Sequence, residues 1–177
     1  MRILTEIHRS EGINIHGRTI QRTAVRAVIL RGRDLLMVHS TTVGDYKFPG
    51  GGVDADESHE QALRREISEE CGALLIEFGQ SIGSIIEYDH PEESDYDVFK
   101  MTSYYYLCQV GDGFGAQTLD GYERDLGFTP AWINIDESIL ANKLLLNSDK
   151  TPEWLKREIF VLEYIRQNFL VSNHGTS

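Results

Sequence analysis

Residues 51–73 read GGVDADESHEQALRREISEECGA, and this stretch decides the fold. Ser58 is followed three residues later by Gln61, a spacing typical of a capping box at the start of a helix. Gly72 stands where a left-handed C-terminal cap belongs. The stretch therefore predicts a helix over residues 59–71.

Three glutamates gather on one side of this predicted helix. Glu66, Glu69 and Glu70 stand at positions i, i+3 and i+4, and at about 100° per residue they fall within an arc of about 100°. Carboxylates this close repel one another, and a bound cation relieves the repulsion. Their hard oxygen atoms favour Mg²⁺ or Mn²⁺ over zinc. Glutamates on a helix usually form a solvated face, but Leu63 and Ile67 place an apolar patch beside this one.

A glycine-rich loop precedes the helix, and Tyr46 to Gly52 read YKFPGGG. Such a loop invites a phosphate-binding interpretation. Its glycine spacing fits neither GxGxxG nor GxxxxGK(S/T), which excludes the dinucleotide-binding and P-loop classes.

The rest of the chain alternates strand-like and helical patterns. Two β-rich runs, 23–30 and 35–41, flank a turn that contains Gly32 and favour a hairpin. Further strands are expected at 73–78, 81–88, 98–109 and 131–135. A short helix is expected from Asp136 and a longer one from Thr151-Pro152, because proline suits the first helical position. Mixed strands with helices indicate an α/β sandwich.

The net charge and apolar content of the chain exclude several classes of function. The 177 residues include 17 Lys and Arg against 28 Asp and Glu, a formal net charge of −11. A field of this sign repels phosphate backbones and anionic lipid, so no binding to nucleic acid or to a membrane is expected. The longest apolar run, Tyr104 to Cys108, is far too short to span a membrane. With Cys71 and Cys108 far apart and no apolar leader, a reduced cytoplasm is the expected location.

The acidic stretch resembles the Nudix box, whose pattern is Gly, five residues, Glu, seven residues, then Arg-Glu-apolar-x-Glu-Glu-x-Gly-apolar. This chain supplies the pattern with Gly51, Glu57, Arg65, Glu66, Ile67, Glu69, Glu70, Gly72 and Ala73. The last position usually holds a bulkier aliphatic residue than alanine. The preceding FPGG, and the later Ala131-Trp132-Ile133 with Asp136-Glu137, extend the resemblance over about residues 22–146.

The resemblance implies the Nudix fold, an α/β/α sandwich with a mixed β-sheet. Residues 22–150 are expected to form this domain. Residues 1–21 are an N-terminal extension whose run from Ile3 to His8 predicts an extra strand. Residues 151–177 are expected to form a C-terminal helix and a short tail packed on the same domain. Relatives use such an N-terminal strand for dimer contacts or to shape the base pocket, so a homodimer is one hypothesis.

By resemblance, the chain is a Mg²⁺-dependent hydrolase that cleaves a diphosphate linking a nucleoside to a second group X, with Mn²⁺ as a substitute ion. The box positions imply Glu66, Glu69 and Glu70 as metal ligands, and the Gly50 carbonyl completes the set. Arg65 is expected to join the catalytic helix to its loop through Glu57, which then stands behind the ligands.

The resemblance leaves the identity of the general base open. In this family it is a glutamate of the box or a carboxylate from a later loop, and Glu66 is the box candidate. Of Glu123 and Asp125, in a later loop, we select Glu123 as a catalytic residue. The acidic run 87–97 contains further rivals, although such a run is usually a solvated loop. These rivals are Glu92, Glu93 and Asp95.

Three basic residues are expected near the mouth of the site. Arg26, His39 and Lys47 would neutralise substrate phosphates there, or serve as ordinary strand and surface residues. The run Tyr104–Tyr106 looks like a base-stacking platform, but strand alternation sends Tyr105 to the opposite face from its neighbours and favours core packing.

The identity of X stays open. ADP-ribose and sugar-nucleotide hydrolases tend to place a proline at a set distance past the box, and dinucleoside-polyphosphate hydrolases a tyrosine. Here Tyr88 lies 15 residues after Ala73 and Pro91 lies 18 after it, and neither decides. Oxidised nucleoside triphosphates are an equal candidate. The alternative function is a catalytically silent Nudix domain that senses a nucleotide, although the intact glutamates argue against it. Removal of messenger-RNA caps would need a basic track that this composition does not offer.

Overall fold

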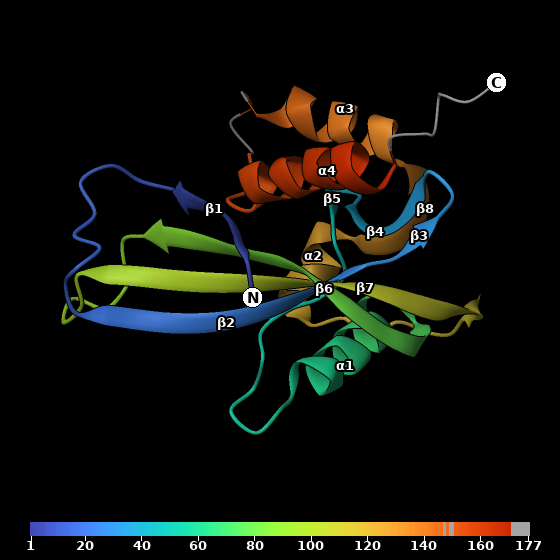
Figure 1. Cartoon of the computed structure of the whole chain (residues 1–177), viewed down its shortest axis with the longest axis horizontal. Helices are drawn as coiled ribbons and strands as arrows, with labels where there is room; N and C mark the ends of the chain where they lie inside the picture. Colours follow the sequence, from blue (N-terminus) through green and yellow to red (C-terminus); the bar gives the residue numbers. More distant parts are fainter. Residues whose placement is uncertain (147, 149–150, 171–177) are drawn as a thin grey trace.

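The computed structural model describes residues 1–146, 148 and 151–170, and Figure 1 shows the order of its elements. The strands are β1 (Ile3–His8), β2 (Thr19–Val28), β3 (Leu30–Arg31), β4 (Asp34–Ser40), β5 (Tyr46–Lys47), β6 (Ala73–Asp89), β7 (Val98–Phe114) and β8 (Phe128–Asn134). The helices are α1 (His59–Cys71), α2 (Gly121–Leu126), α3 (Ile135–Leu145) and α4 (Leu155–Phe169).

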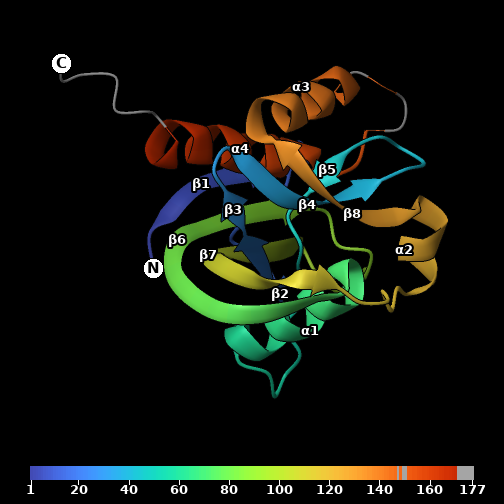
Figure 2. The same ribbon diagram turned by 90° about the vertical axis from the view of Figure 1, so that its right-hand side faces the viewer.

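The strands form two sheets. The larger has the order β1-β6-β7-β2, in which β6 and β7 are antiparallel while β1 with β6 and β2 with β7 are parallel. The smaller contains β3, β4, β5 and β8, and its pairs are antiparallel. Figure 2 shows α1 on one side of the sheets and α3 with α4 on the other. The predicted α/β class with a mixed sheet is confirmed, with a second sheet inside the sandwich.

Helix α1 begins and ends where the sequence predicts. The Ser58 side chain accepts the N–H of Gln61, and the Gln61 side chain accepts the N–H of Ser58, which completes the capping box. Gly72 ends the helix at φ 64°, and any side chain there would overlap the backbone of Gly115. The apolar face, which includes Ile67, is fully buried against the larger sheet.

The two long strands are longer than predicted. Residues 73–78 and 81–88 belong to one strand, β6, which continues through Gly79 with shifts in register against β7. Gly79 suits this close pairing because a side chain there would overlap the carbonyl oxygen of Leu107. The glycine that suggests a break is therefore part of an irregular strand.

The loop over residues 48–53 runs antiparallel along the outer edge of β2. Backbone hydrogen bonds hold it there, among them the bond from the Val25 N–H to the Gly51 carbonyl at 2.9 Å. Gly50 has φ 134°, and a side chain there would overlap the Val25 carbonyl. Because of this pairing, the glycine loop is a fixed edge of the larger sheet.

The larger sheet separates two cores. Val25 and Tyr106 lie in the core that faces α1, and Tyr105 lies in the core shared with the smaller sheet and α4. The predicted alternation of the tyrosines is thus confirmed. Cys71 and Cys108 are buried, free thiols in the first core.

Both ends of the described chain pack on this framework. Strand β1 pairs with β6 and extends the larger sheet. Helix α4 begins at Leu155 rather than at Thr151, because the preceding residues form a turn closed by the bond from the Leu155 N–H to the Pro152 carbonyl at 3.0 Å. Within the described ranges, no helix is long and apolar enough to cross a membrane.

Candidate active site

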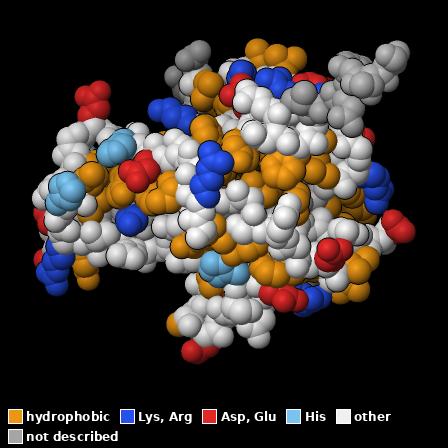
Figure 3. All heavy atoms as spheres, viewed as in Figure 1, with side chains coloured by type: hydrophobic (Ala, Val, Ile, Leu, Met, Phe, Trp, Pro, Cys, Tyr) orange, Lys and Arg blue, Asp and Glu red, His pale blue; other side chains and the backbone are white. Residues whose placement is uncertain are grey.

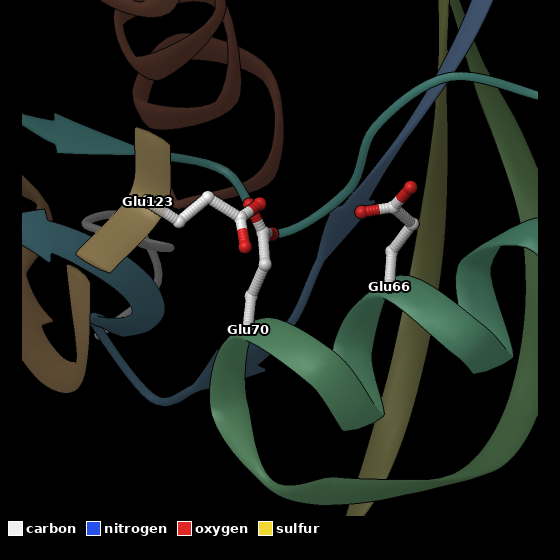
Figure 4. A group of neighbouring side chains, drawn as sticks. All are labelled: Glu66, Glu70 and Glu123. Atoms are coloured by element: carbon white, nitrogen blue, oxygen red, sulfur yellow. The ribbon is translucent and has the colours of Figure 1, made fainter. Parts of the chain in front are cut away.

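Three carboxylates converge from two helices. Glu66 and Glu70 are 8% and 1% exposed on α1, and Glu123 comes from α2. One carboxylate oxygen of each lies within 4.8 Å of those of the other two. Figure 4 shows Glu70 and Glu123 pointing toward one another, with Glu66 one turn earlier on α1. Two residues of the box thus meet the loop glutamate selected from the sequence.

Glu70 is held on both carboxylate oxygens. Lys47 Nζ lies 2.5 Å from Oε1, and the Gly50 N–H donates to Oε2 at 2.7 Å. The carbonyl of Glu70 also accepts a hydrogen bond from the Gln117 side chain. The side chain is therefore oriented by β5 and the glycine loop, and the segment before α2 holds the backbone of the same residue.

The ionised form of Glu66 is electrostatically unfavourable in this structure. Burial raises its pKa, and the nearby charge of Glu70 raises it further, while Arg65 opposes both effects through a hydrogen bond at 2.7 Å. Gly51 makes room for the carboxylate, because a side chain there would overlap it. Like charges gathered in a buried place are a typical feature of cation sites.

Arg65 joins the helix to the loop, as the resemblance to the Nudix box implies. Its Nε and Nη2 donate to the two oxygens of Glu57, each at 2.8 Å, and Nη2 also donates to the Gly52 carbonyl at 3.0 Å. This paired hydrogen bond lowers the pKa of Glu57 to about 2. Glu57 faces the guanidinium of Arg65, which places it behind the three converging carboxylates.

Glu69 lies apart from these carboxylates. Its side chain is 39% exposed and forms an ion pair with Arg65 at 3.2 Å. Among the described residues, it does not belong to the group of Glu66, Glu70 and Glu123.

Helix α2 positions Glu123. Asp120 caps the helix by accepting the Glu123 N–H at 2.8 Å, and the Glu123 side chain accepts the Asp120 N–H at 2.9 Å. Burial raises the pKa of Glu123, and the charge of Glu70 adds to the effect. Of the rival bases, Glu92 and Glu93 line the far wall of the cleft, whereas Asp95 and Asp125 are exposed and outside its lining.

The carboxylates stand in a cleft of about 710 Å³. Its floor is β2 and β7, and its walls are the glycine loop, the loop after β6, α2 and the start of α4. On the face shown in Figure 3, basic side chains are scattered among acidic and hydrophobic ones. The cleft itself is lined by basic, acidic and apolar side chains together.

The predicted phosphate-binding residues lie in two places. The Arg26 Nη1 donates to the Gly50 carbonyl, and Lys47 is bound to Glu70, so both stand in the cleft. His39 stacks on Tyr46 at 4.5 Å between ring centroids, outside the lining of the cleft. The structure therefore brings two of the three to the carboxylates.

Several cleft residues were missed from the sequence. Arg22 on β2, Arg9 after β1, and Arg157 on α4 all line the cleft. A signal existed for the last, because the adjacent Glu158 falls on the apolar stripe of α4 between Leu155 and Leu162, where a charge is unexpected. Arg9 and Arg22 have no comparable signal in the sequence.

A family model described as the NUDIX domain matches residues 20–155. The chain belongs to the Nudix family. This match spans the glycine loop, α1, both sheets except β1, and the turn before α4, and it confirms the resemblance carried by residues 51–73.

Curated relatives of this Nudix chain include two named hydrolases. This chain is 31% identical to an 8-oxo-dGTP diphosphatase of Haemophilus influenzae over 78 aligned residues. The aligned stretch covers 43% of this chain and 52% of that protein. The chain is also 32% identical to an RNA pyrophosphohydrolase of a Sulfurovum species over 98 aligned residues. This stretch covers 50% of this chain and 62% of that protein. The chain thus spans 52–62% of the length of these relatives.

Solved Nudix structures share the fold. A NUDIX hydrolase from Nitrosomonas europaea has a TM-score of 0.53 at 22% identity and covers 80% of this chain and 90% of that one. A UDP-X diphosphatase has a TM-score of 0.52 at 18% identity and covers 84% of this chain and 64% of that one. At these identities, the likeness is one of fold.

Proposed function

We propose that this Nudix chain is a divalent-metal-dependent pyrophosphohydrolase that cleaves a diphosphate linkage in a small nucleotide substrate. The observation that carries the proposal is the convergence of Glu66, Glu70 and Glu123 in one cleft. Two relatives named as a diphosphatase and a pyrophosphohydrolase support the reaction class. We also propose a cytoplasmic location.

The donor set fits a hard divalent ion. Glu66 and Glu70 offer carboxylate oxygens, which Mg²⁺ and Mn²⁺ prefer, and Glu123 faces them from the other side of the group. A cation held by them would relieve the repulsion that helps raise the pKa of Glu66. Glu69 and the Gly50 carbonyl are proposed as further ligands from their places in the box. When bound, the ion neutralises charge on phosphoryl oxygens and activates water.

Hydrolysis breaks one P–O bond of the diphosphate. The oxygen of water forms a bond to phosphorus, the bridging oxygen leaves with the other phosphoryl group, and the proton of water passes to a base. We assign this base to Glu123. Its carboxylate accepts one backbone N–H, whereas both oxygens of Glu70 are already engaged. Burial raises the pKa of Glu123, toward a range where it takes up a proton more readily.

The other residues of the site position these groups. Arg65 and Glu57 fix the start of α1 against the carbonyl of Gly52. Arg26 and Lys47 bring positive charge to the side of the cleft where the phosphoryl oxygens would lie. His39 is outside this set, because its ring stacks on Tyr46 and it does not line the cleft.

A hydrolysis panel tests the proposal. Purified protein is given ADP-ribose, diadenosine polyphosphates, nucleotide sugars, NADH, coenzyme A, and normal and oxidised nucleoside triphosphates, in Mg²⁺ and in chelator. Turnover of one class that is lost in chelator and in Glu70→Gln is the expected result and identifies X. If nothing is hydrolysed while a nucleotide still raises the melting temperature, the chain is a nucleotide sensor and the proposal is wrong.

A further inference from the structure

The floor of the cleft is one face of β2. Side chains alternate along a strand, so Ile20, Arg22, Ala24 and Arg26 all point to the same side, and all four line the cleft. The pairing of β2 with β7 places Phe99 beside Ile20 and Met101 beside Arg22. The floor therefore changes along the strand, from a basic end near the glycine loop to an apolar end.

Most cationic groups of the cleft are already paired with acids. Arg9 binds Glu87 at 3.0 Å and Glu153 at 3.0 Å, Arg157 binds Glu87 at 2.6 Å and Glu158 at 2.9 Å, and Lys47 binds Glu70. These contacts satisfy the cations within the protein. The charges of Arg9 and Arg157 are therefore largely neutralised by these acids before a ligand binds, whereas Lys47 has a single acid partner.

Arg22 and Arg26 differ from the paired group. The Arg22 side chain makes no hydrogen bond or ion pair in the described part of the chain, and its guanidinium lies over Gly52. Arg26 is 9% exposed, and its Nε is a buried donor that has no acceptor in the described ranges. A buried donor without an acceptor is costly, and a ligand oxygen would remove that cost.

The guanidinium groups of the two arginines both reach the glycine loop. Arg22 and Arg26 stand four residues apart on one face of β2, but the Arg22 guanidinium lies over Gly52 and the Arg26 Nη1 reaches the carbonyl of Gly50, two residues away in the loop. Guanidinium groups are the side chains that match phosphate oxygens in pairs. Beyond Arg22, the apolar surface of Ile20, Phe99 and Met101 continues the floor away from the carboxylates.

We infer that Arg22 and Arg26 form a phosphate subsite that holds the nucleoside-side phosphoryl group, with the nucleoside directed over Ile20, Phe99 and Met101. The inference rests on the proposed function and adds the orientation of the substrate. The second group, X, then leaves toward the end of the cleft beyond the glycine loop. Arg22 is the residue that determines affinity for the nucleoside phosphate, since it is the less constrained of the two.

Binding without metal tests this subsite separately from hydrolysis. Adenosine monophosphate, adenosine and inorganic phosphate are titrated by calorimetry into wild type, Arg22→Gln, Arg22→Lys and Arg2→Gln, all in chelator. Arg2 is an exposed arginine just before β1 and outside the cleft, so it is the matched control. We expect the monophosphate to bind wild type and the control equally, and Arg22→Gln at least about tenfold more weakly. Arg22→Lys falls between them, and adenosine and inorganic phosphate bind more weakly than the monophosphate.

Equal binding of the monophosphate to wild type and Arg22→Gln, or no binding without metal, would overturn the subsite. If Glu70→Gln abolishes hydrolysis while Arg22→Gln leaves the KM unchanged, the proposed function stands and the subsite is wrong. If the monophosphate binds through Arg22 and no substrate is hydrolysed, the subsite stands and the proposed function is wrong.

Discussion

The carboxylate of Glu158 on α4 accepts the backbone N–H of Phe48 at 2.8 Å. Two residues later in the same loop, the Gly50 N–H donates to Glu70 at 2.7 Å. Glu158 is fully buried and pairs with Arg157, which also binds Glu87. The last helix therefore fixes the loop that orients a proposed metal ligand.

Loss of Arg157 is expected to destabilise the whole domain. In Arg157→Met, the charge of Glu158 stays buried without its ion-pair partner. Glu87 loses one of its two arginine partners and is left with Arg9. Breaking a buried pair from one side costs about 3–5 kcal/mol, which urea unfolding measures. Lys156→Met, at the exposed neighbouring position of α4, is the control and should change stability by less than about 0.5 kcal/mol. Equal unfolding midpoints for the two variants would contradict this role of Arg157.

Glu123→Gln is expected to reduce turnover at least about tenfold, because general-base catalysis contributes that much or more. The fold should be kept, since Glu123 lies on the short surface helix α2. Initial rates with saturating substrate check this. Asp125→Asn and Glu92→Gln remove two of the rival carboxylates in the same assay. If Glu123→Gln keeps the wild-type rate while Asp125→Asn or Glu92→Gln loses activity, the residue changed in the inactive variant is the base instead.

The metal-free protein should show a pH dependence that comes from Glu66. Burial and the charge of Glu70 raise its pKa above the ordinary value of 4.5. Glu66 therefore loses its proton at a lower pH in the unfolded chain than in the folded one. The free energy of unfolding then decreases as the pH rises from 4.5 through the raised pKa, and it increases again when the pH is lowered to 4.5. We expect Glu66→Gln to be more stable than wild type at neutral pH in chelator, and to lose the stabilisation that Mg²⁺ gives wild type. Urea unfolding at several pH values, with and without Mg²⁺, tests both expectations. If Glu66→Gln is less stable than wild type in chelator, the proposed cost of ionised Glu66 is wrong.

The Arg65–Glu57 pair has a direct spectroscopic readout. Its hydrogen bonds lower the pKa of Glu57 to about 2, so its contribution to stability is present above the ordinary value of 4.5 and is lost as the pH falls through about 2. Arg65→Lys keeps the charge and loses the paired geometry, so the pKa of Glu57 should rise toward 4.5. Carbon-detected NMR titration of the Glu57 carboxyl measures it. An unchanged pKa would show that the paired geometry is not its cause.

Local rules predict much of this molecule from its sequence. The capping box at Ser58 and the glycine at position 72 predict the bounds of α1, because helix ends depend on a few neighbouring residues. The resemblance to the Nudix box, rather than a local rule, implies the contact between Arg65 and Glu57. The Asp120–Glu123 spacing has the same capping pattern, and it is the signal that could have revealed α2.

Other features depend on contacts between distant residues. Gly79 looks like a strand break in the sequence, but pairing with β7 carries β6 through it. His39 was expected near the phosphates, yet its position on β4 places it against Tyr46. The bond from Phe48 to Glu158 joins residues 110 positions apart. No local pattern contains such a contact, because it arises only when α4 packs on the sheets.

Binding of Mn²⁺ to the protein without substrate tests most directly whether Glu66 and Glu70 form the metal centre. Electron paramagnetic resonance would count bound Mn²⁺ in wild type, Glu66→Gln and Glu70→Gln, with Glu92→Gln as the control within the cleft. We predict that both variants bind Mn²⁺ at least about tenfold more weakly, and that the control binds as wild type does. Unchanged affinity in both variants would show that the metal centre lies elsewhere.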